Sequence, residues 1–542
     1  MRRRLTTITL AGACLITLHT AAQQPAPVHI LLQTDQNVYI SGDDAWVDGW
    51  MEKSTDNSRF TRLRLLDRNG KTRTETFLPI YKGAFTGYVS LPDDLPTDTY
   101  FLDAIASAIP SSCRLSPILV VNPRIPPASG CRNPPPEKMS PVQARPADDI
   151  RLRLEKDRFD FQSPVSLNWS VTDGRPIHDI VCRAIRSDAV SQRMDSLGKT
   201  FQHTLIHPNV DRRDDLGHFI RVRITRNGRP IALQRAMAAL KGSHANISGA
   251  LSDSLGILEF LIPRSFDPSR LVIIPDTDKP GDLKWEWLER DQPSPIPFPC
   301  FPWDASLRQD VEDRILNSRL EQRYHPEGVR SVEMSETDTS DFYGKPDHRY
   351  LLDDYTRFPV MEEVFTEIIP QLRIKKDNGR PTLQMLNAPF KAYFPKQALI
   401  LLDGIPVSEG QTILDIDPLR IRSIDVVSRS FTLGHTEYPG ILHLKSYRAD
   451  MAGVPPPQGS LNAPFPGIQR PTTYPEPESK RPSLRNLLWK EQVRAPEGLK
   501  SMDMRFPTSD ATGTYRIRIS GTDAKGNRLQ GETSIFVGQG LR

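Results

Sequence analysis

The sequence predicts a mainly β, multi-domain protein: a series of β-sandwiches plus one small α+β domain. The chain has 542 residues, enough for several hydrophobic cores of ordinary size. It contains 49 prolines, about twice the usual frequency, which disfavours long helices. Apolar and polar residues alternate along most of the chain, as in strands that bury one face. The formal net charge is only +4, so the basic excess of a nucleic-acid-binding protein is absent.

The N-terminal segment, residues 1–22, has the pattern of a secretory signal peptide. Three arginines precede an apolar stretch, which ends at the small residues Ala21 and Ala22. A membrane anchor and a lipoprotein signal at Cys14 are the alternatives. The apolar stretch is short for a membrane span, and Ala11 stands where a lipoprotein signal has a large aliphatic residue. We therefore expect an exported chain with no transmembrane helix after residue 22.

The four cysteines after the leader lie far apart in the sequence. No two have CxxC spacing, so the sequence supports neither a zinc knuckle nor a thioredoxin-type pair. In an oxidising compartment, Cys113 and Cys131 can form a disulfide that closes a short loop across a Pro-rich stretch. Free buried thiols are the alternative.

The first half of the chain contains the segments predicted as sandwiches. Residues 27–122 form the first sandwich, with a hairpin turn at Asn69-Gly70. A Pro-rich linker follows at 123–147. A second β unit covers 148–216, and a third β-sandwich covers 217–275.

The second half contains the predicted α+β domain. Residues 276–341 form an irregular connection with one short helix at 306–323. The α+β domain covers 342–448. Its amphipathic helix covers 359–369, with Val360, Val364 and Ile368 on one face, and begins at Pro359, where the missing N–H would be unpaired anyway. A second Pro-rich linker covers 455–482, and a C-terminal β domain covers 483–542. Strands of the α+β domain are predicted at 382–386, 398–402, 424–427 and 441–445, with a helical turn at 418–423.

The start of the first sandwich resembles that of macroglobulin-type (MG2) domains, in which a Thr-Asp pair, a Tyr, a Gly and an acidic residue recur in order. The matching residues are Tyr39, Gly42, Asp43 and Trp46. The resemblance implies that Tyr39 packs in the sandwich core and that Gly42-Asp43 forms the turn into the next strand. Phe159 resembles Tyr39 in a degenerate second copy, so the predicted sandwiches are Ig-like or macroglobulin-like.

Three short motifs in the α+β segment resemble the plug domain of TonB-dependent receptors from Bacteroidota. They are Asp403-Gly404-Ile405-Pro406, Asp417-Pro418 followed by Asp425, and Tyr438-Pro439-Gly440. The resemblance assigns Asp403 to a turn and Asp417-Pro418 to a helix start. The receptor barrel is missing, since it needs on the order of twenty strands and only a short segment follows. An acidic cluster for catalysis or calcium, comprising Asp403, Asp415, Asp417 and Asp425, is the alternative.

Residues 217–275 resemble the carboxypeptidase-regulatory-like sandwich that often accompanies such plugs. Together these resemblances imply an exported cell-envelope protein of Bacteroidota, in the periplasm or associated with the outer membrane. They imply binding or scaffolding with no catalytic residue, cofactor or metal. The implied partner is an envelope protein, with an outer-membrane barrel as one candidate and a glycan as another.

No catalytic motif stands out in the sequence. The two Gly-Lys-Thr triplets, at 70–72 and 198–200, lack the earlier glycine of a phosphate loop and are interpreted as turns. His203 and His207 are interpreted as surface histidines rather than a metal site. HExxH, GxSxG and a Cys-Gly-Glu-Gln thioester are absent.

Three functions therefore remain under consideration. The first is a non-enzymatic envelope binding or scaffold protein that docks a partner through its plug-like domain. The second is an accessory component of a TonB-dependent uptake or secretion system, in which tryptophans stack on sugars. The third is an unrecognised hydrolase in the irregular region, using acidic residues there. The tryptophans are Trp46, Trp50, Trp285 and Trp287, and the acidic residues are Glu286, Glu289 and Asp304.

Overall fold

The structure of the chain is a computed structural model. It describes residues 27–539 except 52–58, 108, 128–148, 209–215, 243, 264, 267–268, 278, 289–291, 325–329, 332–340, 378, 388–389, 434–435, 474–486 and 525–526. The predicted signal peptide, most of the first linker and Cys131 lie outside these residues. Within them, no helix is both long enough and apolar enough to cross a bilayer. The predicted mainly β, multi-domain fold class is confirmed.

Two sheets packed face to face form the first sandwich. One sheet has the order β14-β8-β1-β3-β6 and the other the order β2-β9-β7-β4-β5. β14 (Thr204–His207) lies within the predicted second β unit, yet it pairs with β8 at the edge of the first sandwich. The other strands are β1 (Val28–Thr34), β2 (Val38–Ile40), β3 (Asp44–Met51), β4 (Phe60–Leu66), β5 (Thr72–Pro79), β6 (Ala84–Ser90), β7 (Asp98–Ala106), β8 (Ser111–Arg114) and β9 (Ser116–Val121).

Cys113 corrects the disulfide prediction. Its side chain points from β8 into the core of the first sandwich, where it is fully buried as a free thiol. Burial also raises the pKa of this thiol well above its usual value. The predicted Cys113–Cys131 bond is therefore wrong for Cys113, which matches the alternative of a free buried thiol. Cys300 is the described cysteine that is disulfide-bonded.

The second sandwich combines two segments that the sequence analysis kept apart. β12 (Pro164–Val171) lies between β10 (Ile150–Leu154) and β36 (Ser501–Pro507) in one sheet. Trp169 packs in one core with Met504 and Ile517. The predicted second β unit and the C-terminal domain are thus parts of one sandwich, because each lacks the strands needed to cover its apolar face. The other sheet has the order β11-β38-β37-β13-β35, with β11 (Arg158–Phe159), β13 (Ile177–Arg186), β35 (Leu487–Leu499), β37 (Gly513–Asp523) and β38 (Arg528–Val537).

The third sandwich also draws a strand from far along the chain. β33 (Leu461–Phe465) lies inside the predicted second linker, yet it pairs with β20 at the edge of a sheet. Pro464 is tolerated there because an edge strand leaves some N–H groups unpaired. β21 (Leu283–Trp287) likewise extends the sandwich past the predicted boundary. The remaining strands are β15 (Gly217–Arg226), β16 (Arg229–Pro230), β17 (Arg235–Leu240), β18 (Asn246–Leu251), β19 (Ile257–Pro263) and β20 (Ser269–Pro275).

Two helices and an extended segment cover the first sandwich. α1 (Ala189–Thr200) begins with a capping box at Asp188, and α2 (Arg308–Tyr324) confirms the helix predicted at 306–323. Phe298 and Phe301, from the extended segment before α2, pack with α1 and the first sandwich in one apolar cluster. A short 3₁₀ turn, η3 (Ala305–Leu307), leads into α2, and β22 (Arg330–Ser331) pairs with β34 (Thr472–Thr473).

The α+β unit has the elements that the sequence predicts. α3 (Met361–Ile368) begins two residues after the predicted Pro359 and buries Val364, Phe365 and Ile368 in the unit's core. Val360 is its N-cap and is exposed, so it is not part of the apolar face as predicted. Its main sheet has the order β23-β29-β32-β27-β28. The strands are β23 (His348–Leu351), β24 (Leu372–Asp377), β25 (Arg380–Asn387), β26 (Ala392–Tyr393), β27 (Leu399–Leu402), β28 (Ile405–Pro406), β29 (Ile421–Val427), β30 (Phe431–Leu433), β31 (Thr436–Tyr438) and β32 (Ile441–Ser446), with α4 (Gly410–Leu414), η4 (Leu352–Asp354), η6 (Pro418–Arg420) and η7 (Met451–Gly453).

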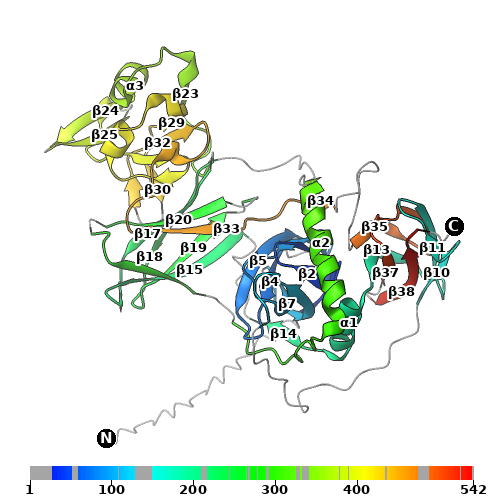
Figure 1. The fold of residues 1–542 in the computed structure, drawn as a ribbon. Helices are drawn as coiled ribbons and strands as arrows, with labels where there is room; N and C mark the ends of the chain where they lie inside the picture. Colours follow the sequence, from blue (N-terminus) through cyan, green and yellow to red (C-terminus); the bar gives the residue numbers. More distant parts are fainter. Residues whose placement is uncertain are drawn as a thin grey trace, which may run out of the picture.

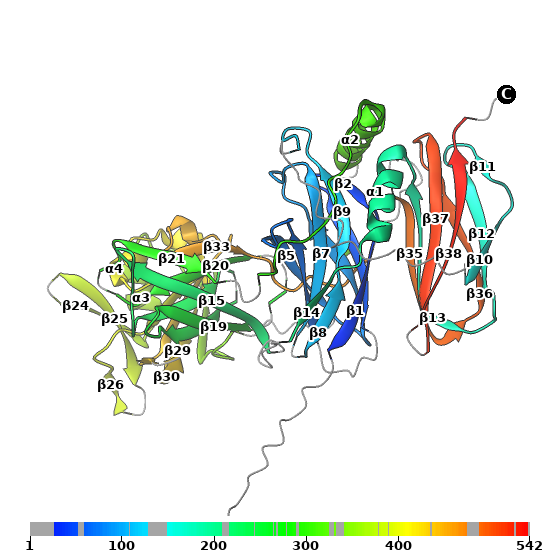
Figure 2. The same ribbon diagram turned by 90° about the horizontal axis from the view of Figure 1, so that it is seen from below.

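The units follow one another in a row. Figure 2 shows the α+β unit and third sandwich at one end, the first sandwich in the middle and the second sandwich at the other end. The chain begins in the first sandwich, enters the second sandwich, and then crosses to the third sandwich and the α+β unit at the other end. It finally returns, and its C-terminal strands complete the second sandwich (Figure 1).

Candidate functional site

The macroglobulin-type residues lie at the start of the first sandwich. The Tyr39 hydroxyl donates to Asp35 Oδ1, which also accepts the Trp46 N–H at 3.0 Å. Gly42 has φ +91°, and a Cβ there would lie 2.4 Å from Asp93 Oδ1. The ring of Tyr39 and the side chain of Trp46 are buried in the sandwich.

Asp43 links this turn to helix α2. Its Oδ2 accepts the Ile40 N–H at 2.8 Å, and its Oδ1 accepts the Ser318 hydroxyl at 2.5 Å. Burial raises the pKa of Asp43 to about 6. Phe159, the degenerate counterpart of Tyr39, is buried in the core of the second sandwich. These residues hold the fold together and leave no open site.

The plug-type residues have separate structural environments. Asp403 and Gly404 form the tight turn between β27 and β28, with φ values of +47° and +81°. Asp403 accepts the N–H of Ser446 at 2.7 Å, its hydroxyl at 2.6 Å, and the N–H of Met451 at 2.7 Å. A Cβ at Gly404 would lie 2.9 Å from Leu240 O, because the turn packs against the third sandwich.

The remaining plug-type residues also have local roles. Asp417 Oδ1 accepts the Leu419 N–H at 2.9 Å at the start of η6, where Pro418 is the first residue. Pro406 is buried opposite Leu401, and Gly440 has φ +143°. Asp415 accepts from Gln411 Nε2 at 2.7 Å. The four aspartates thus have different partners, and the only one in a described group of metal-type ligands is Asp425.

That group, Asp341, Asp425 and His443, is a buried polar network inside the α+β unit. Lys445 Nζ lies 2.9 Å from an oxygen of Asp341 and 3.0 Å from an oxygen of Asp425. Arg349 donates to both oxygens of Asp425 at 2.6 and 2.8 Å. A cation is therefore already present between the two carboxylates.

His443 is also unavailable to a metal. Its Nε2 accepts the Gly404 N–H at 3.1 Å, so Nδ1 carries the proton and donates to the Tyr343 hydroxyl at 2.8 Å. Burial, followed by Lys445, lowers the pKa of His443 to about 3. This network matches its charges internally, and it stabilises the unit rather than binding a metal.

The acidic residues considered for hydrolysis are not assembled either. Glu286 Oε2 accepts from Arg223 at 2.7 Å, and Asp304 caps η3 and pairs with Arg193. Glu289 lies outside the described residues.

Of the tryptophans considered for sugar stacking, Trp46 and Trp50 are buried, whereas Trp287 is 45% exposed. His207 is buried against Asp103 at 3.1 Å, which corrects its interpretation as a surface residue.

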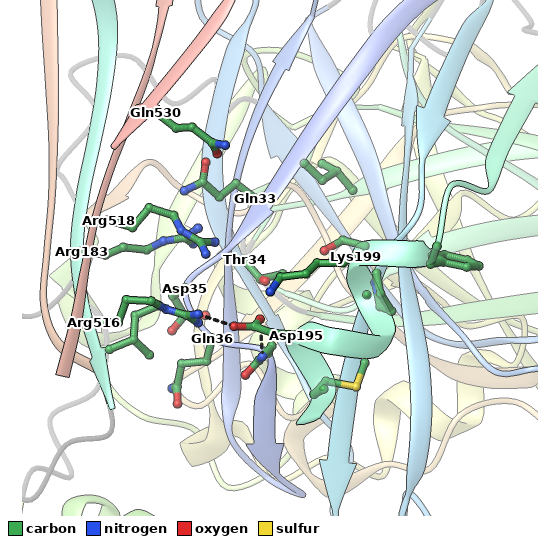
Figure 3. A pocket seen from close by; sticks show the side chains of 18 of the residues that line it. Gln33, Thr34, Asp35, Gln36, Arg183, Asp195, Lys199, Arg516, Arg518 and Gln530 are labelled. Atoms are coloured by element: carbon green, nitrogen blue, oxygen red, sulfur yellow. Dashed lines mark hydrogen bonds and ion pairs between the residues drawn. The ribbon is translucent and has the colours of Figure 1, made fainter. Parts of the chain in front are cut away.

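A cavity of about 380 Å³ lies between the first and second sandwiches. β1 and the following loop form one wall, α1 closes one side, and the sheet of β13, β37 and β38 forms the opposite wall (Figure 3). The lining contains more cations than acids. The cations are Arg114, Arg183, Arg186, Lys199, Arg516, Arg518 and Arg528, and the acids are Asp35 and Asp195.

The strand period explains why arginines line this wall. Tyr515, Ile517 and Ile519 of β37 point into the core of the second sandwich. Arg516 and Arg518 alternate with them and point away from that core, toward the first sandwich. In an isolated sandwich this face would be in water, but here the first sandwich covers it.

A row of three cations and one glutamate crosses this wall. Lys490, Arg183, Arg518 and Glu532 lie directly opposite one another on four adjacent strands. Like charges directly opposite each other are destabilising. Lys490 pairs with Asp48 at 3.0 Å, and Arg518 Nη2 donates to Glu532 at 2.8 Å. Arg183, in the middle of the row, forms no ion pair with a carboxylate of the described residues, although Asp48 and Asp35 lie near enough to act against the lowering of its pKa.

Arg183 is also short of hydrogen-bond acceptors. Its side chain is 3% exposed, and within the described part of the chain Nε and Nη1 have no partner. Burial, followed by Arg518 and Arg528, lowers the pKa of Arg183 to about 9. Gln33 Nε2 and Arg516 Nε are further buried donors without a partner there. The cavity therefore presents donors and positive charge that an anionic oxygen would satisfy.

Sequence reasoning missed this site. The alternation of β37 was visible, so the outward position of Arg516 and Arg518 could be predicted. Their convergence with Arg183 and Lys199 could not, because the four residues come from distant segments. Lys199, in the second Gly-Lys-Thr triplet, lies in the last turn of α1 rather than in the predicted turn.

Comparisons with known proteins give no family assignment. No protein-family model matches the chain, and no curated protein matches it. Among solved structures, α2-macroglobulin from Salmonella reacted with methylamine matches 95% of this chain and 40% of that chain, with 8% identity and a TM-score of 0.22. The Escherichia coli protein matches with the same values in its native conformation. Its trypsin-activated form matches 95% of this chain and 42% of that chain, with 7% identity and a TM-score of 0.23.

This chain therefore spans about two fifths of the length of those structures. TM-scores this low carry no conclusion about function. The cavity between the sandwiches remains the candidate site on its own geometry.

Proposed function

We propose that this chain is an exported, non-enzymatic binding protein that takes an anionic ligand in the cavity between its first two sandwiches. The observation that carries the proposal is Arg183, buried beside two other arginines with two donor nitrogens unpaired. A buried charge without a partner costs several kcal/mol, so this arrangement opposes folding. A bound anion would compensate the buried charge of Arg183 and reduce this cost.

Binding without catalysis fits the side chains at this site. The polar side chains of the lining carry guanidinium, ammonium, amide and hydroxyl groups, and its two carboxylates are engaged. Asp195 pairs with Arg516, and Asp35 accepts from Tyr39 and from Trp46. Such groups orient an anion through hydrogen bonds and charge.

Calorimetric titration of the purified full chain with inorganic phosphate and with sodium succinate tests the proposal. We expect heat of binding from at least one of them, and a loss of about tenfold or more in affinity for Arg183→Gln. Arg151→Gln is the matched control, because Arg151 is exposed on the other sheet of the same sandwich. Equal affinity in both variants would place the bound anion elsewhere and refute the assignment.

A second candidate function is docking of an envelope partner through the α+β unit, with an outer-membrane barrel as the leading partner and a glycan as the alternative. β23 is the terminal strand of the main sheet, and an edge strand can pair with a strand of another protein. Leu351 and Tyr355, each 42% exposed, lie at this edge. This role makes the chain an accessory component of a TonB-dependent uptake or secretion system.

Crosslinked affinity capture from cells of the native host tests the docking role. Leu351→Lys places a charge on the edge strand and is expected to abolish capture of the partner. Leu233→Lys, on an exposed residue of the third sandwich, is the control that should retain capture. Unchanged capture by Leu351→Lys would refute docking at this edge.

A further inference from the structure

We infer that the ligand of the cavity carries at least two separate anionic groups and bridges the first and second sandwiches. This inference rests on the proposed anion-binding function. It adds the charge number of the ligand and the two walls that it contacts.

The first argument is the balance of charge. Three of the cavity's cations have carboxylate partners: Arg516 pairs with Asp195, Arg518 with Glu532 and Arg186 with Asp313. Four have none among the described residues, namely Arg114, Arg183, Lys199 and Arg528. The remaining acid of the lining is Asp35, whose pKa burial raises to about 6. Of these four, Arg183 is buried, whereas Arg114, Lys199 and Arg528 are exposed to solvent. Even with Asp35 ionised, the cations exceed the acids by three, and a ligand with two anionic groups neutralises more of this excess than a monovalent ligand does.

The second argument is the placement of these cations on two walls. Arg183 and Arg528 come from the second sandwich, whereas Arg114 comes from β8 of the first sandwich and Lys199 from α1. Figure 3 shows Lys199 pointing into the cavity from one side, with Arg183 and Arg518 pointing in from the other. A ligand with one anionic group at each wall can form ion pairs with the cations of both walls.

A neutral acceptor on each side of the cavity is already hydrogen-bonded to one of these cations. Gln33 Oε1 accepts from Ser520 Oγ at 2.8 Å and from Arg528 Nη2, and Arg114 Nη2 donates to Phe201 O at 3.1 Å. Arg114 and Arg528 carry like charges on opposite walls of the cavity, and an anion bound between them reduces their repulsion.

The third argument is size. A volume of about 380 Å³ corresponds to roughly a dozen molecules of liquid water. A single inorganic oxyanion of five heavy atoms fills a minor part of it. An elongated ligand with two anionic groups, such as a dicarboxylate or a bisphosphate, fits both the volume and the two-sided charge.

Two matched pairs of probes test the inference on the full chain by calorimetric titration. Succinate is compared with succinamate, which has the same length but one carboxylate, and pyrophosphate is compared with inorganic phosphate. At least one doubly anionic probe is expected to bind about tenfold or more tightly than its partner. Lys199→Gln should remove that preference, and Arg183→Gln should weaken both members of the pair.

The outcomes separate this inference from the function on which it rests. Equal affinity within both pairs, still sensitive to Arg183→Gln, would overturn the two-group ligand and leave anion binding intact. A preference that survives Lys199→Gln would overturn the bridging role of the α1 wall. No binding by any of the four anions would refute the proposed function itself.

Discussion

The cavity wall of the second sandwich and the buried network of the α+β unit differ in whether their buried charges have partners of opposite sign. In the network, Lys445 lies between Asp341 and Asp425, and Arg349 makes two hydrogen bonds to Asp425. Burial alone raises the pKa of Asp425, but Arg349 and Lys445 outweigh it and hold the pKa below its usual value. In the cavity wall, Arg183 has cations on both sides. We therefore interpret the paired charges of the network as structural and the unpaired charge of Arg183 as part of a binding site.

The largest expected effect comes from breaking the matched network. Lys445→Met leaves Asp341 and Asp425 buried with less compensation, so we expect a loss of about 3–5 kcal/mol in the stability of the α+β unit. Native-state hydrogen exchange of the β29 and β32 amides measures it without unfolding the other units. Lys375→Met, an exposed lysine on β24, is the control. A loss below about 1 kcal/mol would contradict the structural role assigned to the network.

The next effect is a pH dependence in the first sandwich. Burial raises the pKa of Asp35 and of Asp43 from 3.8 to about 6. Between about pH 4 and pH 6 the folded state therefore binds more protons than the unfolded state, and stability falls as the pH rises. The fall is up to about 3 kcal/mol for each group and is complete above the folded-state pKa.

Asp43→Asn isolates one of these two groups. An asparagine keeps an acceptor for the Ile40 N–H but does not titrate in this range. Hydrogen exchange of the β2 and β9 amides at pH 4.5 and pH 7 should show a weaker pH dependence in the variant. An unchanged pH profile would show that Asp43 is not the titrating group.

A smaller effect is expected at the cap of η6. Asp417→Ala removes the acceptor for the Leu419 N–H, and cap losses of this kind cost about 1 kcal/mol. Asp417→Ser keeps a capping oxygen and should restore most of the stability, as measured by exchange of the nearby amides. If the serine variant is no better than the alanine variant, the cap does not stabilise this turn.

The smallest effect on stability is expected at the unmatched charge. Arg183→Met removes a buried cation that has cationic neighbours, so we expect stability to stay unchanged or to rise by about 1 kcal/mol. Exchange of the β13 amides measures it. A loss above about 2 kcal/mol would place Arg183 with Lys445 among the structural charges and remove the contrast between the two regions.

The α+β unit shows how far local pattern reaches. Pro359 and the spacing of Val360, Val364 and Ile368 predicted α3 to within two residues of its start, and apolar runs predicted β25, β27, β29 and β32. Each of these elements is specified by residues within a few positions of one another. The second sandwich shows the opposite, because β12 pairs with β36, which lies more than 300 residues further along the chain.

The sequence by itself determined many of the strands, two of the main helices to within two residues of their starts, and which side of each strand is apolar. These follow from a period of two residues in strands and of 3.6 in helices. The sequence did not predict α1 (Ala189–Thr200), which lies within the predicted second β unit. Only the tertiary structure decided which strands share a sheet, that Cys113 is enclosed in a core, and that a strand forms inside the second Pro-rich segment. It also decided that Arg183 and Lys199 line one cavity. The reason is physical: alternation requires that an apolar face be covered, but many segments satisfy that requirement equally well, and the choice among them depends on contacts between distant parts of the chain.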